Sequence, residues 1–214
     1  AGRVGVSACP CATDGQPTGK TSPPGVFPAP VILGGPPDPP RPRPRGGGEG
    51  PRGDRGRGGE SRLPPAELAR GQKKLRLAAM LLYSFPGSPT LYYGDEAGMQ
   101  GFEDPLNRGT YPWGGEDGSL LAFFRRLGQL RAERISMQCG IIRYLHAQGG
   151  GLVVERLHGT ERTVTALNAG DTPLELTLPW DRRLCIDAVT GQQFLSQNGT
   201  VRLTLPPLDG VILV

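Results

Sequence analysis

The sequence is poor in the residues that build metal sites, and it contains no long apolar run. Among its 214 residues only two are histidine, His146 and His158, and of the four cysteines only Cys9 and Cys11 lie close together. Because a zinc site needs four such ligands, usually in two closely spaced pairs, we expect unpaired thiols and no metal. No stretch of about 18 apolar residues is present to span a membrane. The N-terminus lacks the basic and then apolar pattern of a secretory signal, but this says little about localisation because the sequence need not include the true start. The compartment is left unknown, with the cytoplasm slightly favoured over export.

The first 62 residues almost lack aromatic side chains and are unusually rich in proline and glycine. Phe27 is the only aromatic residue there, whereas 13 prolines and 15 glycines make up nearly half of the segment. That share exceeds the roughly 25–30% that marks low-complexity chain. Such a segment buries too little apolar surface to offset the entropy lost on ordering. We therefore predict that residues 1–62 form a disordered leader.

The charge of this leader leaves three interpretations open. Residues 1–62 hold 9 Lys and Arg against 5 Asp and Glu, while the rest of the chain holds 15 of each. One interpretation is an RNA-binding tail built on the arginines of residues 41–45, but aromatics that would stack on bases are absent, so we expect no nucleic-acid partner. A disordered linker is the second. The third is a frame-shifted stretch, because a GC-rich gene read in the wrong frame yields runs of proline, glycine, arginine and alanine.

Beyond the leader, the sequence carries two helix signals with a strand signal between them. Pro64 and Pro65 are typical of the start of a helix, and Pro86-Gly87 is expected to end that helix. A second helix is predicted from Ser119 to Arg134. Apolar residues recur at helical spacing as a stripe in both helices: Leu68, Leu75, Ala78, Ala79 and Leu82 in the first, and Leu120, Phe124, Leu127 and Leu130 in the second. The arginines of the second helix are expected to be exposed: Arg125, Arg126, Arg131 and Arg134. Between the helices, Thr90 to Tyr93 is predicted to be a short strand buried on both faces of a parallel sheet.

From residue 140 onward the pattern changes to short strands separated by turns. Seven apolar or alternating segments begin at Ile141, Gly151, Arg162, Pro173, Leu184, Thr200 and Gly210. Glycine-containing turns separate most of them, which favours an antiparallel β-sandwich of about 75 residues. The predicted fold class is therefore α/β plus all-β, with a helix–strand–helix unit followed by the sandwich.

Charged and aromatic residues are most concentrated in the long loop from Gly94 to Gly118. The loop follows the C-terminal end of the predicted strand, where α/β barrels carry their sites, and it is too long to be a simple connection. Asp104 accepts hydrogen bonds from hydroxyl groups, and Arg108 presents a planar fork of donors. Together with the ring faces of Tyr111 and Trp113, these groups suit a sugar. The alternative is a salt bridge between Asp104 and Arg108 that only pins the loop.

The residues of this loop resemble those of the α-amylase superfamily of glycoside hydrolases. The likeness rests on G-S-P-T-L-Y-Y-G-D-E-A-G-M at 87–99, D-P-L-N-R at 104–108 and P-W at 112–113. It covers about residues 63–214 and is nearest to the neopullulanase, cyclomaltodextrinase and α-glucosidase-like branch. The resemblance implies that residues 63–138 are the end of a catalytic (β/α)8 TIM barrel, and that residues 139–214 are the β-sandwich domain after it. It also implies that Asp104 and Arg108 contact glucose units of an α-glucan or maltooligosaccharide, and we place Trp113 with them.

The resemblance further implies retaining hydrolysis or transfer at α-glucosidic bonds. That reaction needs a carboxylate nucleophile, a carboxylic acid and a further aspartate, which belong to strands upstream of residue 63 in the family. We therefore predict no catalytic residue here and no activity for the chain alone. Asp95 and Glu96 are adjacent on an extended segment and point to opposite sides, so with Tyr93 they are expected to support the site structurally. No cofactor is expected; calcium occurs in the family, but no calcium site is evident in this chain.

Two other functions remain open on the residues alone. One is a non-catalytic carbohydrate-binding protein that uses Asp104, Arg108 and Trp113 without chemistry. The other is an RNA-interacting protein that works through the arginine- and glycine-rich leader. The sequence leaves the oligomeric state, the linkage preference and the choice between hydrolysis and transglycosylation open.

Overall fold

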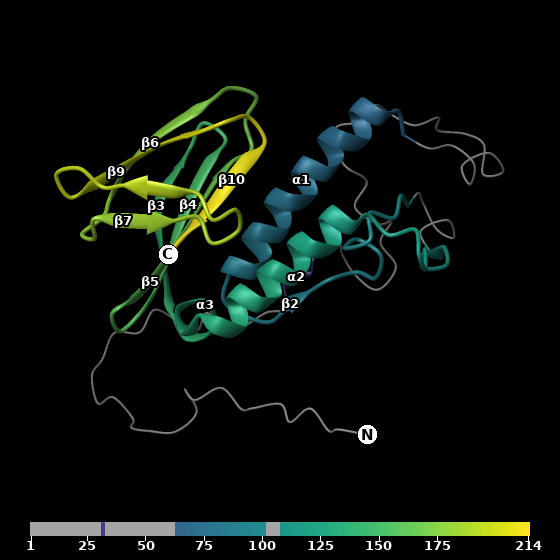
Figure 1. Cartoon of the computed structure of the whole chain (residues 1–214), viewed down its shortest axis with the longest axis horizontal. Helices are drawn as coiled ribbons and strands as arrows, with labels where there is room; N and C mark the ends of the chain where they lie inside the picture. Colours follow the sequence, from purple (N-terminus) through teal and green to yellow (C-terminus); the bar gives the residue numbers. More distant parts are fainter. Residues whose placement is uncertain (1–30, 33–62, 102–107) are drawn as a thin grey trace, which may run out of the picture.

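A computed structural model describes residues 31–32, 63–101 and 108–214. Helices α1 (Pro65–Ser84) and α2 (Gly118–Glu133) lie side by side, and the short strand β2 (Pro89–Thr90) connects them through the long loop (Figure 1). The short helix α3 (Ile135–Cys139) then leads into the strand region. Its strands are β3 (Ile141–Gln148), β4 (Gly151–His158), β5 (Glu161–Asn168), β6 (Leu174–Pro179), β7 (Leu184–Ile186), β8 (Gln193–Leu195), β9 (Thr200–Leu205) and β10 (Asp209–Leu213).

Helix α1 has the predicted bounds, but its buried face is broader than the sequence pattern indicated. Pro65 occupies the first turn, where its missing N–H leaves no bond unmade, and the Phe85 N–H donates to the Leu81 carbonyl at the other end (3.0 Å). The fully buried apolar residues are Leu77, Ala79, Met80, Leu82 and Tyr83, whereas Leu68, Leu75 and Ala78 are only half-buried. Both α2 and the sheet cover this helix, so its buried face extends beyond one predicted stripe.

Helix α2 begins where Asp117 caps it. The Asp117 carboxylate accepts hydrogen bonds from the backbone N–H groups of Ser119 (3.0 Å) and Leu120 (3.1 Å), which satisfies donors that have no partner inside the helix. The four predicted stripe residues are all buried, and Phe123 is buried with them. The sequence pattern therefore predicted the packing of α2 more closely than that of α1.

The strand region forms an antiparallel sandwich, as predicted. Strands β10, β5, β4 and β3 form one sheet in that order, while β6 pairs with β9 and β7 pairs with β8. Asn198 (φ 51°) and Gly199 (φ 74°) turn the chain into β9, in the left-handed backbone region that Asn-Gly favours. Strand β8 was not predicted, because only Phe194 of its three residues packs against the core.

The four-stranded sheet is buried on both faces, which gives the molecule three layers. On one face, Val164 and Ala166 of β5 share a core with the β6 and β9 residues Leu176 and Leu203. On the other face, Leu167 shares a second core with the apolar residues of α1 and α2. This explains the nearly continuous burial along β4 and β5. The predicted fold class is confirmed, and the helices and the sandwich share one of the two cores.

The short strand between the helices differs from its prediction. The ladder covers Pro89 and Thr90 only, Leu91 and Tyr92 are half-buried, and Tyr93 is exposed. It pairs in parallel with β1 (Val31–Ile32), the one part of the expected disordered leader that the structure describes. A strand extends only as far as it has a hydrogen-bonded partner. Because β1 pairs with two residues of β2, the strand ends at Thr90 instead of reaching Tyr93.

Of the four arginines that were expected to be exposed, Arg125 is exposed, whereas Arg126, Arg131 and Arg134 are half-buried. Arg126 donates to the Ala188 carbonyl (2.7 Å). Arg131 donates to the backbone carbonyls of Tyr83 and Phe85, and Arg134 donates to the carbonyl of Arg162 (2.8 Å). Helical periodicity places these three on the outer face, but their long side chains reach back to carbonyls of neighbouring segments.

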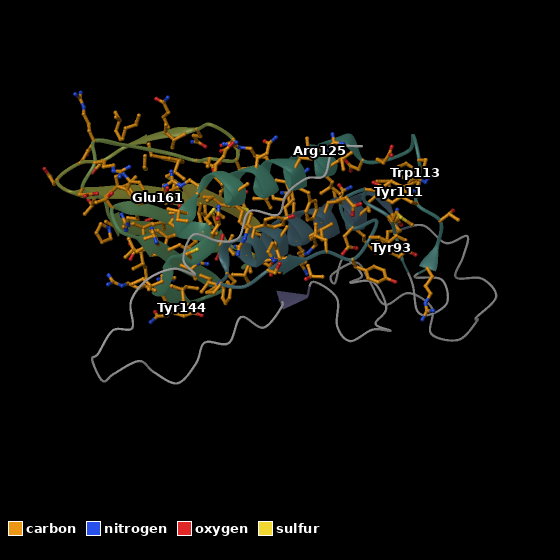
Figure 2. The ribbon with its side chains drawn as sticks, turned by 90° about the horizontal axis from the view of Figure 1, so that it is seen from below. Tyr93, Tyr111, Trp113, Arg125, Tyr144 and Glu161 are labelled. Carbon is orange, nitrogen blue, oxygen red and sulfur yellow. The ribbon has the colours of Figure 1, made fainter. Side chains whose placement is uncertain are left out.

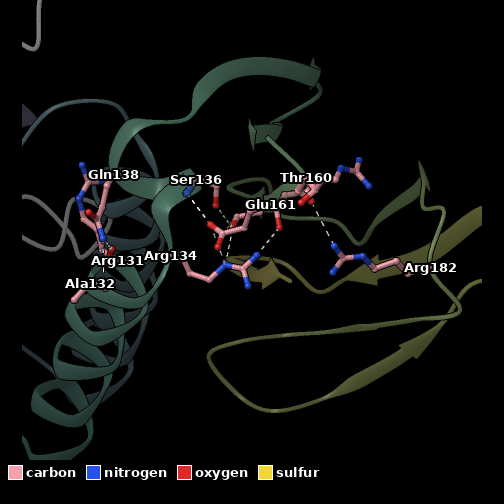
Figure 3. Close-up of polar contacts among 10 residues, drawn as sticks. Arg131, Ala132, Arg134, Ser136, Gln138, Thr160, Glu161 and Arg182 are labelled. Atoms are coloured by element: carbon pink, nitrogen blue, oxygen red, sulfur yellow. Dashed lines mark hydrogen bonds and ion pairs between the residues drawn. The ribbon is translucent and has the colours of Figure 1, made fainter. Parts of the chain in front are cut away.

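Polar contacts join α3 to the β4–β5 hairpin (Figure 3). The Ser136 N–H donates to the Glu161 carboxylate (2.6 Å), and Arg134 lies 3.7 Å from the same carboxylate. Although burial raises the pKa of Glu161, the hydrogen bonds from Ser136 and the charge of Arg134 outweigh it, and the net pKa is lowered. These contacts fix the angle between the helical unit and the sandwich.

The two described cysteines differ in their state. Within the described residues Cys185 is a buried free thiol, whereas Cys139 is in a disulfide, so the expectation of unpaired thiols fails for Cys139. Of the helices described, none has the length and apolar character needed to cross a membrane.

Candidate functional site

The candidate site is built on a wound turn that follows β2. The Asp95 N–H donates to the Tyr92 carbonyl (3.2 Å), and the Met99 N–H donates to the Gly94 carbonyl (2.9 Å). Gly94 (φ 88°) and Gly98 (φ 73°) adopt backbone conformations that side chains disfavour. The spacing G-D-E-A-G therefore reflects the shape of this turn, and it leaves Asp95 only 4% exposed.

Two side chains of the turn reach across to the far arm of the loop. The Tyr93 hydroxyl donates to the Gly109 carbonyl (3.2 Å), and Glu96 is hydrogen-bonded to the Tyr111 hydroxyl. Partial burial, followed by the charges of Glu96 and Glu116, raises the pKa of Tyr111. Tyr93 and Glu96 thus hold the two arms of the loop together.

The base of the loop is closed by Asp117. Its N–H donates to the Ala97 carbonyl (3.0 Å), and its carboxylate accepts a hydrogen bond from Gln72 of α1 (2.8 Å). A Cβ atom at Gly98 would lie 3.1 Å from Asp117 Cβ and 3.2 Å from the Leu120 side chain, so glycine is also needed for close approach. The turn, α1 and the N-terminus of α2 therefore meet at a single carboxylate.

An aromatic pair lies on the far arm of the loop. The rings of Tyr111 and Trp113 have centroids 4.7 Å apart at 51°, and Trp113 is 86% exposed. Figure 2 shows both rings with Tyr93 at the end of the molecule opposite Tyr144 and Glu161. An exposed tryptophan supported by a second ring is a ready surface for a ligand with an apolar face.

The three predicted substrate-binding residues are not all described. Arg108 and Trp113 are exposed residues of the loop, while Asp104 lies outside the described residues. The predicted supporting residues Tyr93 and Glu96 make the contacts given above. Gln72 and Gly109 were missed, because they are linked to the loop only by contacts that no local pattern reveals.

The described residues contain no group of three or more His, Cys, Asp or Glu side chains arranged to hold a metal ion.

Comparison with known proteins identifies the region. No family model matches the chain. It is 33% identical over 157 residues to an amylopullulanase of Thermoanaerobacter thermohydrosulfuricus, covering 66% of this chain and 11% of that protein. It is 30% identical over 146 residues to a cyclomaltodextrinase of Geobacillus thermopakistaniensis, covering 65% of this chain and 25% of that protein. The crystal structure of an Anoxybacillus α-amylase matches with a TM-score of 0.62 and 28% identity, over 67% of this chain and 32% of that one.

The chain belongs to the α-amylase family. The match is to the C-terminal region, and the chain spans between about a tenth and a third of the length of these proteins. The resemblance inferred from the loop residues is thus confirmed.

The same region also occurs in a protein with a different kind of name. The chain is 28% identical over 178 residues to the amino acid transporter heavy chain SLC3A2 of Mus musculus, covering 65% of this chain and 34% of that protein. Possession of this region therefore does not by itself indicate hydrolysis, and the function has to be argued from the loop.

Proposed function

We propose that the loop from Gly94 to Gly118 is part of the substrate-binding rim of a retaining glycoside hydrolase that acts on α-glucosidic bonds. The substrates are starch-like α-glucans or maltooligosaccharides. In this proposal residues 63–138 are the end of the catalytic barrel, and residues 139–214 are the sandwich domain that follows it. The observation that carries the proposal is the exposed Trp113 supported by the half-buried Tyr111, on a loop whose two arms are joined by hydrogen bonds, in a member of the α-amylase family.

The chemistry of the loop fits a glucose unit. The faces of a pyranose ring are apolar and its edge carries hydroxyl groups, so an aromatic ring and a set of fixed hydrogen-bonding groups bind it together. Trp113 offers the ring, and Arg108 offers N–H donors for the hydroxyl oxygens. Asp104, which accepts from hydroxyl groups, completes the proposed set. The bracing by Tyr93 and Glu96 limits the entropy that the loop loses on binding.

The chain alone is proposed to be inactive. Retaining hydrolysis needs two carboxyl groups about 5–5.5 Å apart on either side of one bond. Asp95 is buried, and Glu96 accepts the Gly94 N–H (3.0 Å) and binds Tyr111, so both carboxylates suit support of the loop rather than bond cleavage. The nucleophile and acid are assigned to the upstream part of the barrel.

A chimaera tests this proposal. Residues 63–214 replace the corresponding C-terminal region of the Anoxybacillus α-amylase, and hydrolysis of maltoheptaose is measured. We expect an active enzyme in which Arg108→Ala and Trp113→Ala each raise KM about tenfold, a loss of about 1.4 kcal/mol of substrate binding. Arg182→Ala, an exposed arginine on the sandwich, is the control and leaves KM unchanged. Unchanged KM in both loop variants of a folded, active chimaera would remove the loop from the substrate site.

The alternative of a non-catalytic carbohydrate-binding protein is separated by the same chimaera. The similarity to SLC3A2 supports this alternative, because the name of that relative is not that of a glycosidase. A folded chimaera that binds maltoheptaose without releasing product, and loses binding with Trp113→Ala, would favour it over the hydrolase.

A further inference from the structure

The last carbonyl groups of α1 accept hydrogen bonds from two arginines of other elements. Arg131 of α2 donates through one nitrogen to the carbonyls of Tyr83 (2.5 Å) and Phe85 (3.1 Å), and through another to that of Gly87. Arg156 of β4 donates to the carbonyl of Ser84 (2.8 Å). No basic residue of α1 itself lies in its last turn. The negative end of this helix is therefore capped by guanidinium groups from α2 and from the sandwich.

Arg156 is buried and Arg131 is half-buried. Arg156 is only 1% exposed, and burial lowers its pKa to about 10. Burial also lowers the pKa of Arg131. Within the described residues neither arginine forms an ion pair with a carboxylate, and both donate to backbone carbonyls. A buried guanidinium without a counter-charge is a weak contributor to stability, but its planar fork fixes the direction of each carbonyl that it binds.

The same arginine from the sandwich also holds the start of the strand region. Arg156 Nε and Nη2 donate to the Gly140 carbonyl (3.1 and 2.8 Å), so one side chain joins the end of α1 to the residue before β3. A second link lies beside it, where the hydroxyl groups of Ser84 and Thr165 are 2.6 Å apart. The sandwich thus contacts the end of α1 through two buried polar links.

The segment that these arginines hold leads directly to the candidate site. Residues 83–87 are followed at once by β2 and then by the turn of residues 92–99, whose hydrogen bonds shape the near arm of the loop. Fixing the carbonyls of 83–87 therefore fixes the position and direction from which the loop starts.

We propose that Arg131 and Arg156 are positioning residues for the candidate sugar-binding loop, and that Arg156 gives the sandwich domain a part in substrate binding. The arginines act through residues 83–87 and β2 and do not touch the sugar. The binding part of this inference rests on the proposed function, whereas the positioning part concerns the loop alone.

Hydrogen exchange of the full chain tests the positioning part without any sugar. We expect Arg156→Met to raise amide exchange at residues 92–99 about tenfold relative to the wild-type chain, while strands β6 and β9 keep their protection. Arg202→Met, on the exposed face of β9, is the control for the substitution itself. A second control matches the loss of global stability: of Leu203→Ala and Leu203→Val, the variant whose free energy of unfolding in a denaturant titration is nearest to that of Arg156→Met is used. Equal exchange at 92–99 in Arg156→Met and in the stability-matched variant would overturn the proposal.

A milder substitution keeps the test decisive if Arg156→Met does not fold. Arg131→Lys and Arg156→Lys retain the charge but lose the fork, so each is expected to raise exchange at 92–99 by a smaller factor than removal of the charge. Wild-type exchange at 92–99 in both lysine variants would contradict the role given to the fork.

The chimaera tests the binding part. Arg156→Lys is expected to raise KM for maltoheptaose about fivefold with kcat nearly unchanged, since only the placement of binding groups is altered. A fall in kcat with KM unchanged would contradict positioning. If the wild-type chimaera neither binds nor hydrolyses the sugar, the proposed function fails, and the exchange experiment still decides whether the arginines position the loop.

Discussion

At the scale of single residues, Asp117 connects more of the candidate site than any local signal indicates. It caps α2, receives Gln72 of α1 and closes the base of the loop on Ala97. A carboxylate that accepts several hydrogen bonds favours its charged form, chiefly through the backbone N–H of Leu120, and its pKa is lowered. The geometry of the loop base therefore depends on one ionised side chain.

Replacing this cap tests its contribution. Asp117→Ala is expected to lower the free energy of unfolding by about 1–2 kcal/mol, because the N-cap bonds and the Gln72 bond are lost together. Urea titration of the full chain measures the change. Asp117→Asn retains a capping oxygen and is expected to lose less than Asp117→Ala; equal stability of wild type and Asp117→Ala would contradict the account.

The lowered pKa of Asp117 also predicts an acid dependence. Its folded pKa lies below the unfolded value near 3.8, so the unfolded state binds more protons in this range and stability falls as pH falls. The contribution is complete above about pH 4 and is lost as the pH drops through the folded pKa. We expect the loss of stability on acidification to be smaller in Asp117→Asn than in wild type. Parallel pH profiles below pH 4 would show that this carboxylate does not titrate as described.

Gly98 gives a steric prediction at the same place. Alanine there must adopt φ 73° and place its Cβ about 3.1 Å from Asp117 Cβ. We expect Gly98→Ala to destabilise the chain by about 1–3 kcal/mol and to raise the accessibility of Trp113 to acrylamide. Gly114→Ala is the matched control, since φ there is 77° and nothing lies within 4 Å of the added carbon. The same loss of stability in both variants would assign the effect to backbone strain alone.

At the scale of elements, sequence patterns predicted segments whose burial is one-sided. Strands β6 and β9 alternate buried and exposed residues and were predicted nearly to their ends, as was the stripe of α2. The pattern missed what depends on distant partners. The buried face of α1 is set by two neighbours, the length of β2 by its strand partner, and the roles of Arg131 and Arg156 by carbonyls far away in the sequence.

For the candidate site, the sequence likewise predicted the local features and missed the contacts between distant residues. The motif residues located the loop. The braces from Tyr93 to Gly109 and from Glu96 to Tyr111 span the loop, and no periodicity specifies such contacts. Their detection required the folded backbone.

The shared core makes a prediction for the helices. Leu127 of α2 is fully buried in the core that also contains Leu167 and Ile212 of the sheet. We expect Leu127→Ala to cost about 2–5 kcal/mol and to lower the midpoint of one transition that includes the strands. Circular dichroism at helix and strand wavelengths during urea titration checks this. Loss of the helical signal well before the strand signal would show that the sandwich folds independently of α1 and α2.

At the scale of the whole molecule, the described chain has two parts: a helix–strand–helix unit and a β-sandwich (Figure 1). Helices α1 and α2 pack on the outer face of the four-stranded sheet, so the helices and the two sides of the sandwich form three layers. Both helices start at the loop end and run toward the sandwich, so the loop lies at the carboxyl end of β2, as sites do in α/β barrels. A barrel of this type takes about 250 residues. In the proposed function, barrel strands upstream of residue 63 complete the substrate site and supply the reacting carboxylates.

The most direct measurement of the central claim compares the full chain with the chimaera in maltoheptaose, using proton NMR to follow the anomeric signals of the products. We predict no hydrolysis by the chain alone, and release of product in the α-configuration by the chimaera, as retention requires. Hydrolysis by the chain alone, or release of the β-anomer by the chimaera, would contradict the account.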